Sequence, residues 1–264
     1  MSRPIIALLT DFGLRDHYAG TMKGVALGIC PEATLVDISH EVPAHDVLAG
    51  ALELAASFRY FPPGTIFLVV VDPGVGSSRR GIAAEAGDYR FVAPDNGVLT
   101  IALAEAPPGR VIELTDPRYA LPDVSRTFEG RDRFAPAAAW LARGIELTAL
   151  GRPAGALRQI DIPRPSVTAG GIDGEVLRVD RFGNLITNID RKTFEAIGSL
   201  DALTIAVGSR KVPTIVSTYA DASPGQLCAL FGSSDCLEIA ANGASAAIAV
   251  AAGRGAAVHV GRRA

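Results

Sequence analysis

The first part of the chain alternates short apolar runs with segments whose apolar residues recur at helical spacing. The run over residues 65–71 is apolar on both faces, which is typical of a strand in the middle of a parallel sheet covered by helices. This βαβ alternation predicts a doubly wound α/β domain. The predicted strands span residues 4–9, 33–38, 65–71, 89–93 and 111–114, and the predicted helices span 18–29, 47–58 and 136–143.

The pattern changes between residues 151 and 171, where proline and glycine are frequent. Short β-like runs separated by turns follow, a spacing that predicts a small antiparallel barrel or sandwich. We therefore predict two domains, residues 1–160 and 161–264. The predicted strands of the second domain span residues 174–179, 184–189, 202–207, 211–218, 226–231, 236–240 and 257–260.

Composition excludes several classes of partner. The chain has 264 residues and a formal net charge of −3, without the concentrated basic stripe that phosphate backbones require. The small-residue run 240–252 is shorter than the ~20 apolar residues of a membrane span, and no signal peptide is evident. The three cysteines lack metal-ligand spacing and are expected to be reduced. We predict a cytoplasmic protein with no nucleic-acid or membrane partner.

Four polar turns lie at or just beyond predicted strand ends, where open α/β sheets bind ligands. Each alone fits an ordinary Asp/Gly turn, but four carboxylate-bearing turns in one domain favour a site. Asp11 could accept hydrogen bonds from both hydroxyls of a ribose, or could instead cap the following helix. Its Asp-Phe-Gly triplet is not a kinase motif, because the phosphate loop, strand lysine and catalytic loop are missing. The turns are 10–13, 72–76, 93–97 and 127–132.

Read in order, these turns and the motifs of the second domain resemble the S-adenosyl-L-methionine (SAM) hydroxide adenosyltransferase family, relatives of the fluorinases and chlorinases. The match covers nearly the whole chain. It implies an N-terminal Rossmann-like domain with a mostly parallel sheet, a smaller all-β barrel-like C-terminal domain, and a homotrimer with each site between neighbouring subunits. The motifs are Thr10-Asp11-Phe12-Gly13, Asp72-Pro73-Gly74-Val75-Gly76 with Arg79, Pro94-Asp95-Asn96-Gly97, Thr127-Phe128-Glu129-Gly130-Arg131-Asp132, Phe182-Gly183-Asn184 and Gly232-Ser233-Ser234 through Asn242.

The resemblance also assigns substrate-binding roles, although a plain β-turn at 182–184 and a strand-face aromatic at 219 are the simpler interpretations. The implied contacts are Asp11 with the ribose diol, Asp16 and Asp180 with the methionine ammonium, Asn184 with the adenine edge, Phe182 and Tyr219 around the adenine, Ser233 with the methionine carboxylate, and backbone groups at Gly243 with adenine.

The same resemblance implies the reaction. Family members that use hydroxide activate water with an Asp, an Arg and a His, and Asp72 and Arg79 match the first two. Halogenases carry tyrosine at the position of Asp72, so this residue favours water over halide. Glu129 stands where the histidine is expected. It would either place a second carboxylate beside Asp72 and Arg79, raising one carboxyl pKa, or turn outward as a loop residue.

We therefore expect hydrolysis of SAM to adenosine and L-methionine by in-line attack of activated water at ribose C5′. Neither metal nor cofactor is expected, because SAM is itself the substrate and the four histidines share no metal-ligand spacing. His45 is expected near the ribose end in a supporting role. Two alternatives stay open: a halogenase using chloride or fluoride, with which Gly130 is compatible, and a non-catalytic protein that binds adenosine or SAM.

Overall fold

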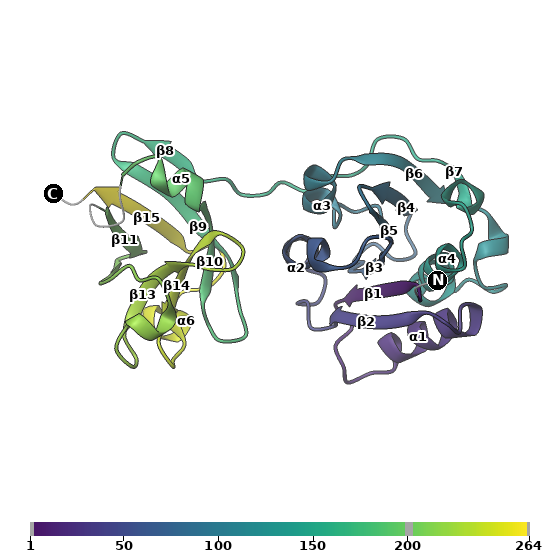
Figure 1. Cartoon of the computed structure of the whole chain (residues 1–264), viewed down its shortest axis with the longest axis horizontal. Helices are drawn as coiled ribbons and strands as arrows, with labels where there is room; N and C mark the ends of the chain where they lie inside the picture. Colours follow the sequence, from purple (N-terminus) through teal and green to yellow (C-terminus); the bar gives the residue numbers. More distant parts are fainter. Residues whose placement is uncertain (1–2, 199–202, 263–264) are drawn as a thin grey trace. The chain divides into compact units, whose positions relative to one another are not determined.

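The computed structural model describes residues 3–198 and 203–262. The chain divides into two compact units, Met1–Asp161 and Ile162–Ala264. Each unit has its own hydrophobic core, and Figure 1 shows the helices and strands of both units.

A seven-stranded sheet of order β2-β1-β3-β5-β4-β6-β7 is the centre of the N-terminal unit. Its strands are β1 (Ile5–Thr10), β2 (Thr34–Ser39), β3 (Ile66–Val70), β4 (Gly81–Ala86), β5 (Tyr89–Pro94), β6 (Pro108–Leu114) and β7 (Gly151–Pro153). The helices are α1 (Tyr18–Ile29), α2 (Val47–Ser57), α3 (Thr100–Glu105) and α4 (Ala135–Ala142), with shorter helical turns η1 (Phe58–Tyr60), η2 (Pro117–Tyr119), η3 (Gly130–Phe134) and η4 (Leu147–Leu150).

Helices cover both faces of this sheet. Apolar side chains of α1 and α4, such as Met22 and Leu141, join one core with alternate strand residues. Those of α2 and α3, such as Leu54 and Ala102, join the core on the other face. β3 is completely buried, as its apolar residues on both faces require. The three-layer α/β architecture is confirmed.

The predicted mostly parallel, Rossmann-like sheet is only partly confirmed. β2, β1, β3 and β5 are parallel neighbours, but β4, β6 and β7 pair antiparallel. The missed strand β4 is rich in glycine and alanine, which have low strand propensity, and it forms a hairpin with β5 through the Gly87–Asp88 turn. Three of the six strand pairings in this sheet are therefore antiparallel, and one of them, β4 with β5, is a hairpin.

The C-terminal unit is a strongly bent antiparallel sheet of order β12-β11-β15-β9-β10-β14-β13, to which β8 adds beside β9. Residues beyond β12 pair with β13 through an Ile215–Ala229 bridge, which nearly closes the sheet into a barrel. The strands are β8 (Ser166–Thr168), β9 (Gly171–Val179), β10 (Leu185–Asp190), β11 (Leu203–Val207), β12 (Arg210–Val212), β13 (Leu227–Phe231), β14 (Cys236–Ala241) and β15 (Ala257–Arg262).

Two details of the predicted C-terminal domain are corrected. The domain is not all-β, because it also contains α5 (Arg191–Glu195), α6 (Ala246–Val250) and the turn η6 (Tyr219–Asp221). The predicted strand 211–218 ends at Val212, because Pro213 lacks the N–H that the ladder needs. Residue 202 of the predicted strand 202–207 lies outside the described residues. Within those residues, no helix is both long and apolar enough to cross a membrane.

Candidate functional site

The N-terminal sheet has a switch point between β1 and β3. The chain runs from β1 to β2 on one side, then crosses to β3 on the other side of β1. The carboxyl ends of these parallel strands lie at one edge, with Thr10 in register with Val70. Asp11 directly follows β1, and Asp72 lies two residues after β3. Open α/β sheets bind ligands at such a point.

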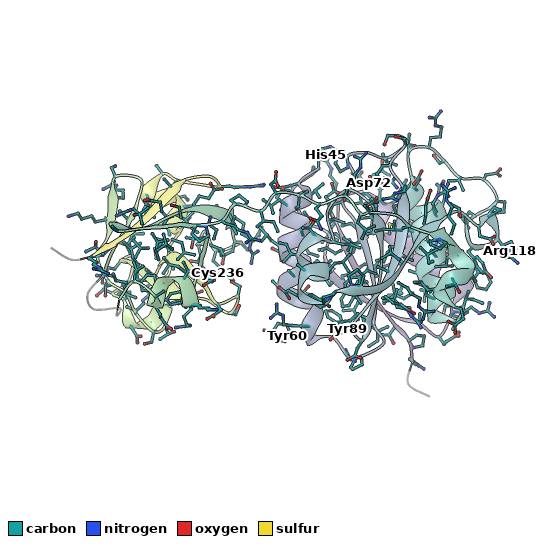
Figure 2. The ribbon with its side chains drawn as sticks, turned by 90° about the horizontal axis from the view of Figure 1, so that it is seen from above. His45, Tyr60, Asp72, Tyr89, Arg118 and Cys236 are labelled. Carbon is teal, nitrogen blue, oxygen red and sulfur yellow. The ribbon has the colours of Figure 1, made fainter. Side chains whose placement is uncertain are left out.

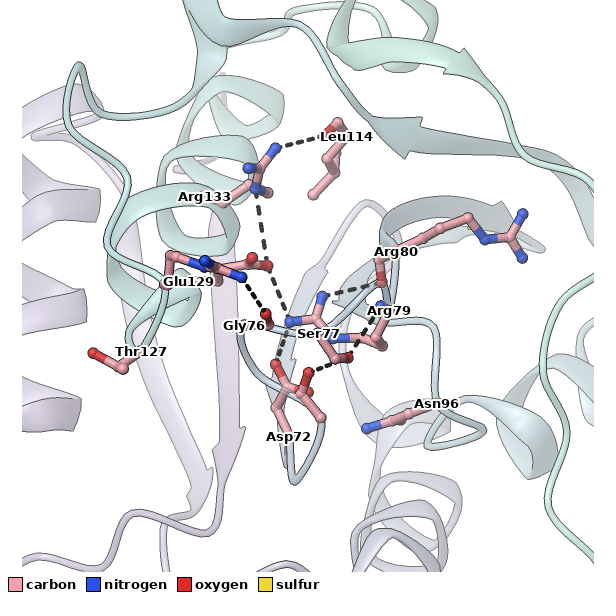
Figure 3. A network of polar contacts seen from close by, with 12 residues as sticks. Asp72, Gly76, Ser77, Arg79, Arg80, Asn96, Leu114, Thr127, Glu129 and Arg133 are labelled. Carbon is pink, nitrogen blue, oxygen red and sulfur yellow. Dashed lines mark hydrogen bonds and ion pairs between the residues drawn. The ribbon is translucent and has the colours of Figure 1, made fainter.

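Arg79 joins the carboxylates of two of the polar turns (Figure 3). Its Nη2 donates to Asp72 Oδ2 at 2.6 Å and to Glu129 Oε2 at 3.0 Å. The side chains of Arg79, Asp72 and Glu129 are 3%, 6% and 15% exposed, so this ion-pair network is nearly removed from solvent. All three predicted catalytic residues therefore lie together, and Glu129 points toward Arg79 rather than outward.

Burial and charge act in opposite directions on Asp72. Burial raises the pKa of its carboxyl group, the Arg79 guanidinium lowers it, and the negative charge of Glu129 raises it again; the net pKa is above the ordinary value. Asp72 Oδ1 is also buried, and no described group makes a hydrogen bond to it. A buried acceptor of this kind favours a donor such as water at that position.

Local structure explains why the 72–79 turn keeps this shape. Gly76 has φ 77°, and a Cβ on it would overlap the Arg126 carbonyl oxygen, so glycine is required there. Ser77 Oγ donates to the Gly74 carbonyl at 2.6 Å and accepts from the Arg79 N–H at 3.2 Å. The Arg79 guanidinium also lies 5.2 Å from the centroid of the Phe134 ring. The turn thus presents Asp72 and holds Arg79 in one orientation.

Asp11 is not a helix cap, which excludes that alternative. α1 begins at Tyr18 with His17 in the cap position, while Asp11 Oδ2 accepts the backbone N–H of His45 at 2.8 Å. His45 has φ 67° and lies in the N-terminal unit with Asp72 (Figure 2). His45 thus contacts Asp11, the residue expected to bind the ribose, through its backbone. Asp16 is exposed in the bend before α1.

The carboxylates of the other polar motifs have structural partners. Asp95 pairs with Arg80 and accepts the Arg158 backbone N–H at 2.9 Å. Asp132 is fully buried, is bound by Arg131, and accepts the Ser125 N–H at 2.8 Å. These two turns therefore stabilise the fold around the Asp72 cluster.

The C-terminal unit contains a cavity of ≈ 830 Å³. All six predicted substrate-binding residues of this unit line it: Asp180, Phe182, Asn184, Tyr219, Ser233 and Gly243. Phe182 is 76% exposed and Tyr219 40%, an exposure of large aromatic side chains that is typical of a binding surface. The structure thus divides the predicted residues between two places, five in the N-terminal unit and six around this cavity.

The predicted turn at 182–184 is present and explains the place of Asp180. Its Oδ1 accepts the N–H groups of Phe182 and Asn184, and its Oδ2 accepts Asn184 Nδ2 at 2.9 Å. Gly183 has φ 84°, and a Cβ there would overlap Ser245. Asp180 therefore shapes the loop that presents Phe182.

Two charged residues that line the cavity, Arg178 and Glu238, were not predicted. Glu238 lies between Leu237 and Ile239, whose side chains are in the core of the unit. A single carboxylate in an otherwise apolar strand was a readable signal. Within residues 3–198 and 203–262, no group of three or more His, Cys, Asp or Glu could hold a metal ion.

Known proteins resemble this chain along nearly its whole length. The SAM hydroxide adenosyltransferase N-terminal domain model matches residues 6–151, and the C-terminal domain model of the same family matches residues 174–259. The (R)-S-adenosyl-L-methionine hydrolase of Thermus thermophilus is 40% identical, with 92% of this chain and 94% of the relative covered. The protein of the same name from Salinispora tropica is 39% identical, with 92% of each covered.

A fluorinase and a solved structure also resemble this chain over most of its length. A fluorinase of an Actinoplanes species is 32% identical, with 83% of this chain and 84% of the relative covered. The crystal structure of an uncharacterized conserved protein from Thermotoga maritima superposes with a TM-score of 0.92 at 36% identity, covering 97% of this chain and 100% of that one.

Proposed function

The chain belongs to the SAM hydroxide adenosyltransferase family, and we propose that it hydrolyses SAM to adenosine and L-methionine. The observation that carries the mechanism is the buried Asp72–Arg79 pair with Asp72 Oδ1 left to accept a further hydrogen bond. Because three relatives are named as hydrolases of (R)-S-adenosyl-L-methionine, we also propose that the (R) sulfonium isomer is the substrate.

The chemistry requires a nucleophile rather than an acid. The sulfonium leaves as a neutral thioether, so no proton is needed on the leaving group. Water bound to Asp72 Oδ1 forms the new C5′–O bond, while the C5′–S bond breaks and its electron pair stays on sulfur. The proton of the water passes to Asp72. Positioning the water in line behind C5′ supplies much of the remaining acceleration.

Asp72, rather than Glu129, is the proposed base. Its raised pKa makes it a stronger proton acceptor than an ordinary aspartate while it is ionised, and a base is most effective when its pKa approaches the working pH. Glu129 shares Arg79 with Asp72 and fixes the guanidinium from the other side. In this proposal, Glu129 and Arg79 position the base, and neither takes the proton.

The substrate contacts follow the positions of the two clusters. Asp11, held by the His45 N–H, is proposed to bind the ribose diol, and Asp16 to approach the methionine amine. Around the C-terminal cavity, Phe182 and Tyr219 would enclose the adenine, Asn184 and the backbone at Gly243 would bind its edge, and Ser233 would bind the methionine carboxylate. SAM needs no further cofactor in this scheme.

A halogenase is the second candidate, favoured by the fluorinase relative. The charges at the site disfavour halide binding. Asp72 and Glu129 carry two negative charges next to one Arg79 guanidinium, and a halide at Asp72 Oδ1 would meet a like charge in a buried place. In a non-catalytic binding protein, the buried Asp72–Arg79 pair would have a structural role only.

We further propose that the protein works in the cytoplasm as a homotrimer whose sites combine the domains of neighbouring subunits. This rests on the family resemblance and on the division of the candidate residues between two units. Sedimentation equilibrium measures the subunit number. A monomer that hydrolyses SAM at full rate would contradict the assembly but not the reaction.

The function is tested by incubating the full chain with separated (R) and (S) sulfonium isomers of SAM in ¹⁸O-labelled water. Adenosine labelled at its 5′-oxygen, formed preferentially from the (R) isomer, is the expected product. Parallel reactions with added chloride or fluoride should yield no 5′-halogenated nucleoside. Intact SAM in every reaction would overturn the proposed function.

A further inference from the structure

The segment between β2 and α2 holds the turn after β1 at three points. The Gly13 N–H donates to the His40 carbonyl at 2.7 Å. The His45 N–H donates to Asp11 Oδ2 at 2.8 Å. The third contact joins two side chains, because Nδ1 of the His40 ring lies 2.8 Å from the Thr10 hydroxyl oxygen. The first two contacts use backbone N–H groups, whereas the third depends on the identity of both side chains.

This third contact is buried and lies directly before Asp11. Thr10 is 0% exposed and His40 is 3% exposed. The Thr10 hydroxyl also accepts the Phe12 N–H at 3.3 Å, so it bonds to the turn on one side and to the ring on the other. A hydroxyl with two such partners has a fixed orientation. The peptide that leaves Thr10 carries Asp11, so these bonds fix the direction from which the Asp11 side chain leaves the chain.

The His40 ring is held from its far side as well. Its Nε2 lies 3.0 Å from Asp37 Oδ1, and Lys23 Nζ lies 2.5 Å from Asp37 Oδ2. Burial raises the pKa of Asp37, but hydrogen bonds from Lys23 and His40 outweigh burial and bring the pKa below its ordinary value. Asp37 is therefore a carboxylate near neutral pH, which favours a proton on the facing Nε2. Nδ1 is then left to accept the O–H of Thr10.

We propose that Thr10 and His40 are positioning residues that aim the Asp11 carboxylate at the ribose diol, and that the preference for a ribonucleoside over a dideoxynucleoside depends on the bond between them. This inference rests on the proposed function, in which Asp11 binds the diol. Both side chains are buried, so they act through Asp11 and not on the substrate itself.

The diol makes a strict demand on Asp11. Its side chain is only partly buried, and the His45 N–H bonds one of its two oxygens. Hydrogen bonds weaken steeply when donor and acceptor are misaligned, and two hydroxyl groups must be met at once. Loss of the bond between Thr10 and His40 releases the turn at one of its three points. The contacts to the diol should therefore weaken, whereas a ligand without the diol should bind as before.

The test compares adenosine with 2′,3′-dideoxyadenosine, which lacks only the two ribose hydroxyl groups that Asp11 would bind. Isothermal titration of the full chain gives both affinities. The wild type should prefer adenosine by about ten- to a hundredfold, the range expected for hydrogen bonds to a charged group. Thr10→Val keeps the branched shape but removes the hydroxyl, and should lose about tenfold of this preference while binding the dideoxy analogue as before. Thr10→Ser restores the hydroxyl and should recover the preference.

The control removes another buried threonine hydroxyl. Thr65 is 1% exposed and donates to the Pro62 carbonyl just before β3, so Thr65→Val should leave the preference unchanged. An unchanged preference in Thr10→Val, or a loss that falls equally on both nucleosides, would overturn the inference. So would an equal loss of preference in Thr65→Val.

Failure of the inference can be told apart from failure of the proposed function. A wild type that hydrolyses SAM but does not prefer adenosine would overturn the inference alone. A wild type that binds neither nucleoside and leaves SAM intact would overturn both. Should Thr10→Val not fold, His40→Gln replaces it, because the longer side chain keeps a donor near Asp37 and puts a methylene group in the place of Nδ1. It should lose the preference in the same way, and retention would refute the role.

Discussion

Each of the two units contains a pair of carboxylates at its candidate site, and the two pairs have different hydrogen-bond and ion-pair partners. In the N-terminal unit, Asp72 and Glu129 share the buried guanidinium of Arg79. Around the C-terminal cavity, Asp180 and Glu238 receive their hydrogen bonds from neutral backbone, amide and phenol groups. The Arg79 guanidinium holds the first pair in place without a ligand. The second pair has neutral hydrogen-bond donors, and the Arg178 guanidinium, which also lines the cavity, acts on Glu238 through its charge and lowers its pKa.

This difference suits the two tasks. A base must be in place before water arrives, and an arginine holds it without taking its proton. A recognition site gains selectivity when the ligand supplies the missing charge, because a ligand without that charge leaves the carboxylate uncompensated. Burial raises the pKa values of both Asp72 and Glu238, and in each case a guanidinium, that of Arg79 or of Arg178, acts in the opposite direction.

The largest expected effect is on the rate when Asp72 becomes Asn. The amide keeps the shape of the side chain but cannot accept a proton, so adenosine formation should fall by about 10²–10⁴-fold, the contribution of a general base. Chromatography of products measures the rate, and titration with adenosine and methionine should show binding within about twofold of wild type. Asp123→Asn, in an exposed loop, is the matched control. An Asp72→Asn enzyme with near wild-type turnover would exclude this residue as the base.

Stability should respond most to Arg79. Replacing it with Ala leaves Asp72 and Glu129 buried without their shared cation, so the free energy of unfolding should fall by about 3–5 kcal/mol. Arg79→Lys keeps the charge and should lose less. Urea denaturation measures both variants. The exposed Arg118→Ala, whose ion pair with Asp116 is at the surface and screened by solvent, should change stability far less. Equal losses for Arg79→Ala and Arg118→Ala would show that the buried cluster is not a stabilising unit.

A smaller effect is expected from Tyr219→Phe. Removing the phenolic donor should raise the pKa of the buried Glu238 carboxyl group further. At a given pH, a larger share of Glu238 should therefore be protonated in the variant than in the wild type. NMR of the side-chain carboxyl carbon at several pH values measures this pKa, with the exposed Tyr60→Phe as control. An unchanged pKa would show that Tyr219 does not stabilise the charged form of Glu238.

Local patterns predicted the parallel part of the fold well. Helices 18–29 and 47–58 and strand 65–71 follow from strong periodicity or burial on both faces, and the structure has them within a residue or two. β4 was not predicted from the sequence because its alanines and glycine have low strand propensity. Pairing with β5 and β6 holds this segment extended. The strand predicted at 211–218 was too long, because Pro213 lacks the backbone N–H that would continue the ladder beyond Val212.

The candidate site, like the fold, was only partly predictable from the sequence. The family resemblance assigned Asp72, Arg79 and Glu129 to one catalytic group. The structure brings both carboxylates within hydrogen-bond distance of the Arg79 guanidinium. Glu238 is not among the residues named in the motifs, and its one sequence signal is that it is a lone carboxylate in an apolar strand; its contacts with Tyr219 and Gly232 exist only in the folded unit. Likewise, Asp95 and Asp132 could not be separated from Asp72 by sequence, because only the structure shows that arginines and backbone N–H groups occupy them.

The finest test of the comparison is the pH dependence of Glu129→Gln. Glu129 raises the pKa of Asp72 through its negative charge, so the neutral amide should lower that pKa. Because the base must be ionised, the acid limb of the kcat/KM profile should move to lower pH, while turnover on the plateau changes less than in Asp72→Asn. The exposed Glu32→Gln is the control and should leave the limb in place. An acid limb that moves to higher pH would mean that Glu129 itself takes the proton or that Arg79 has left Asp72, and the cluster would then not be a base held by a shared cation.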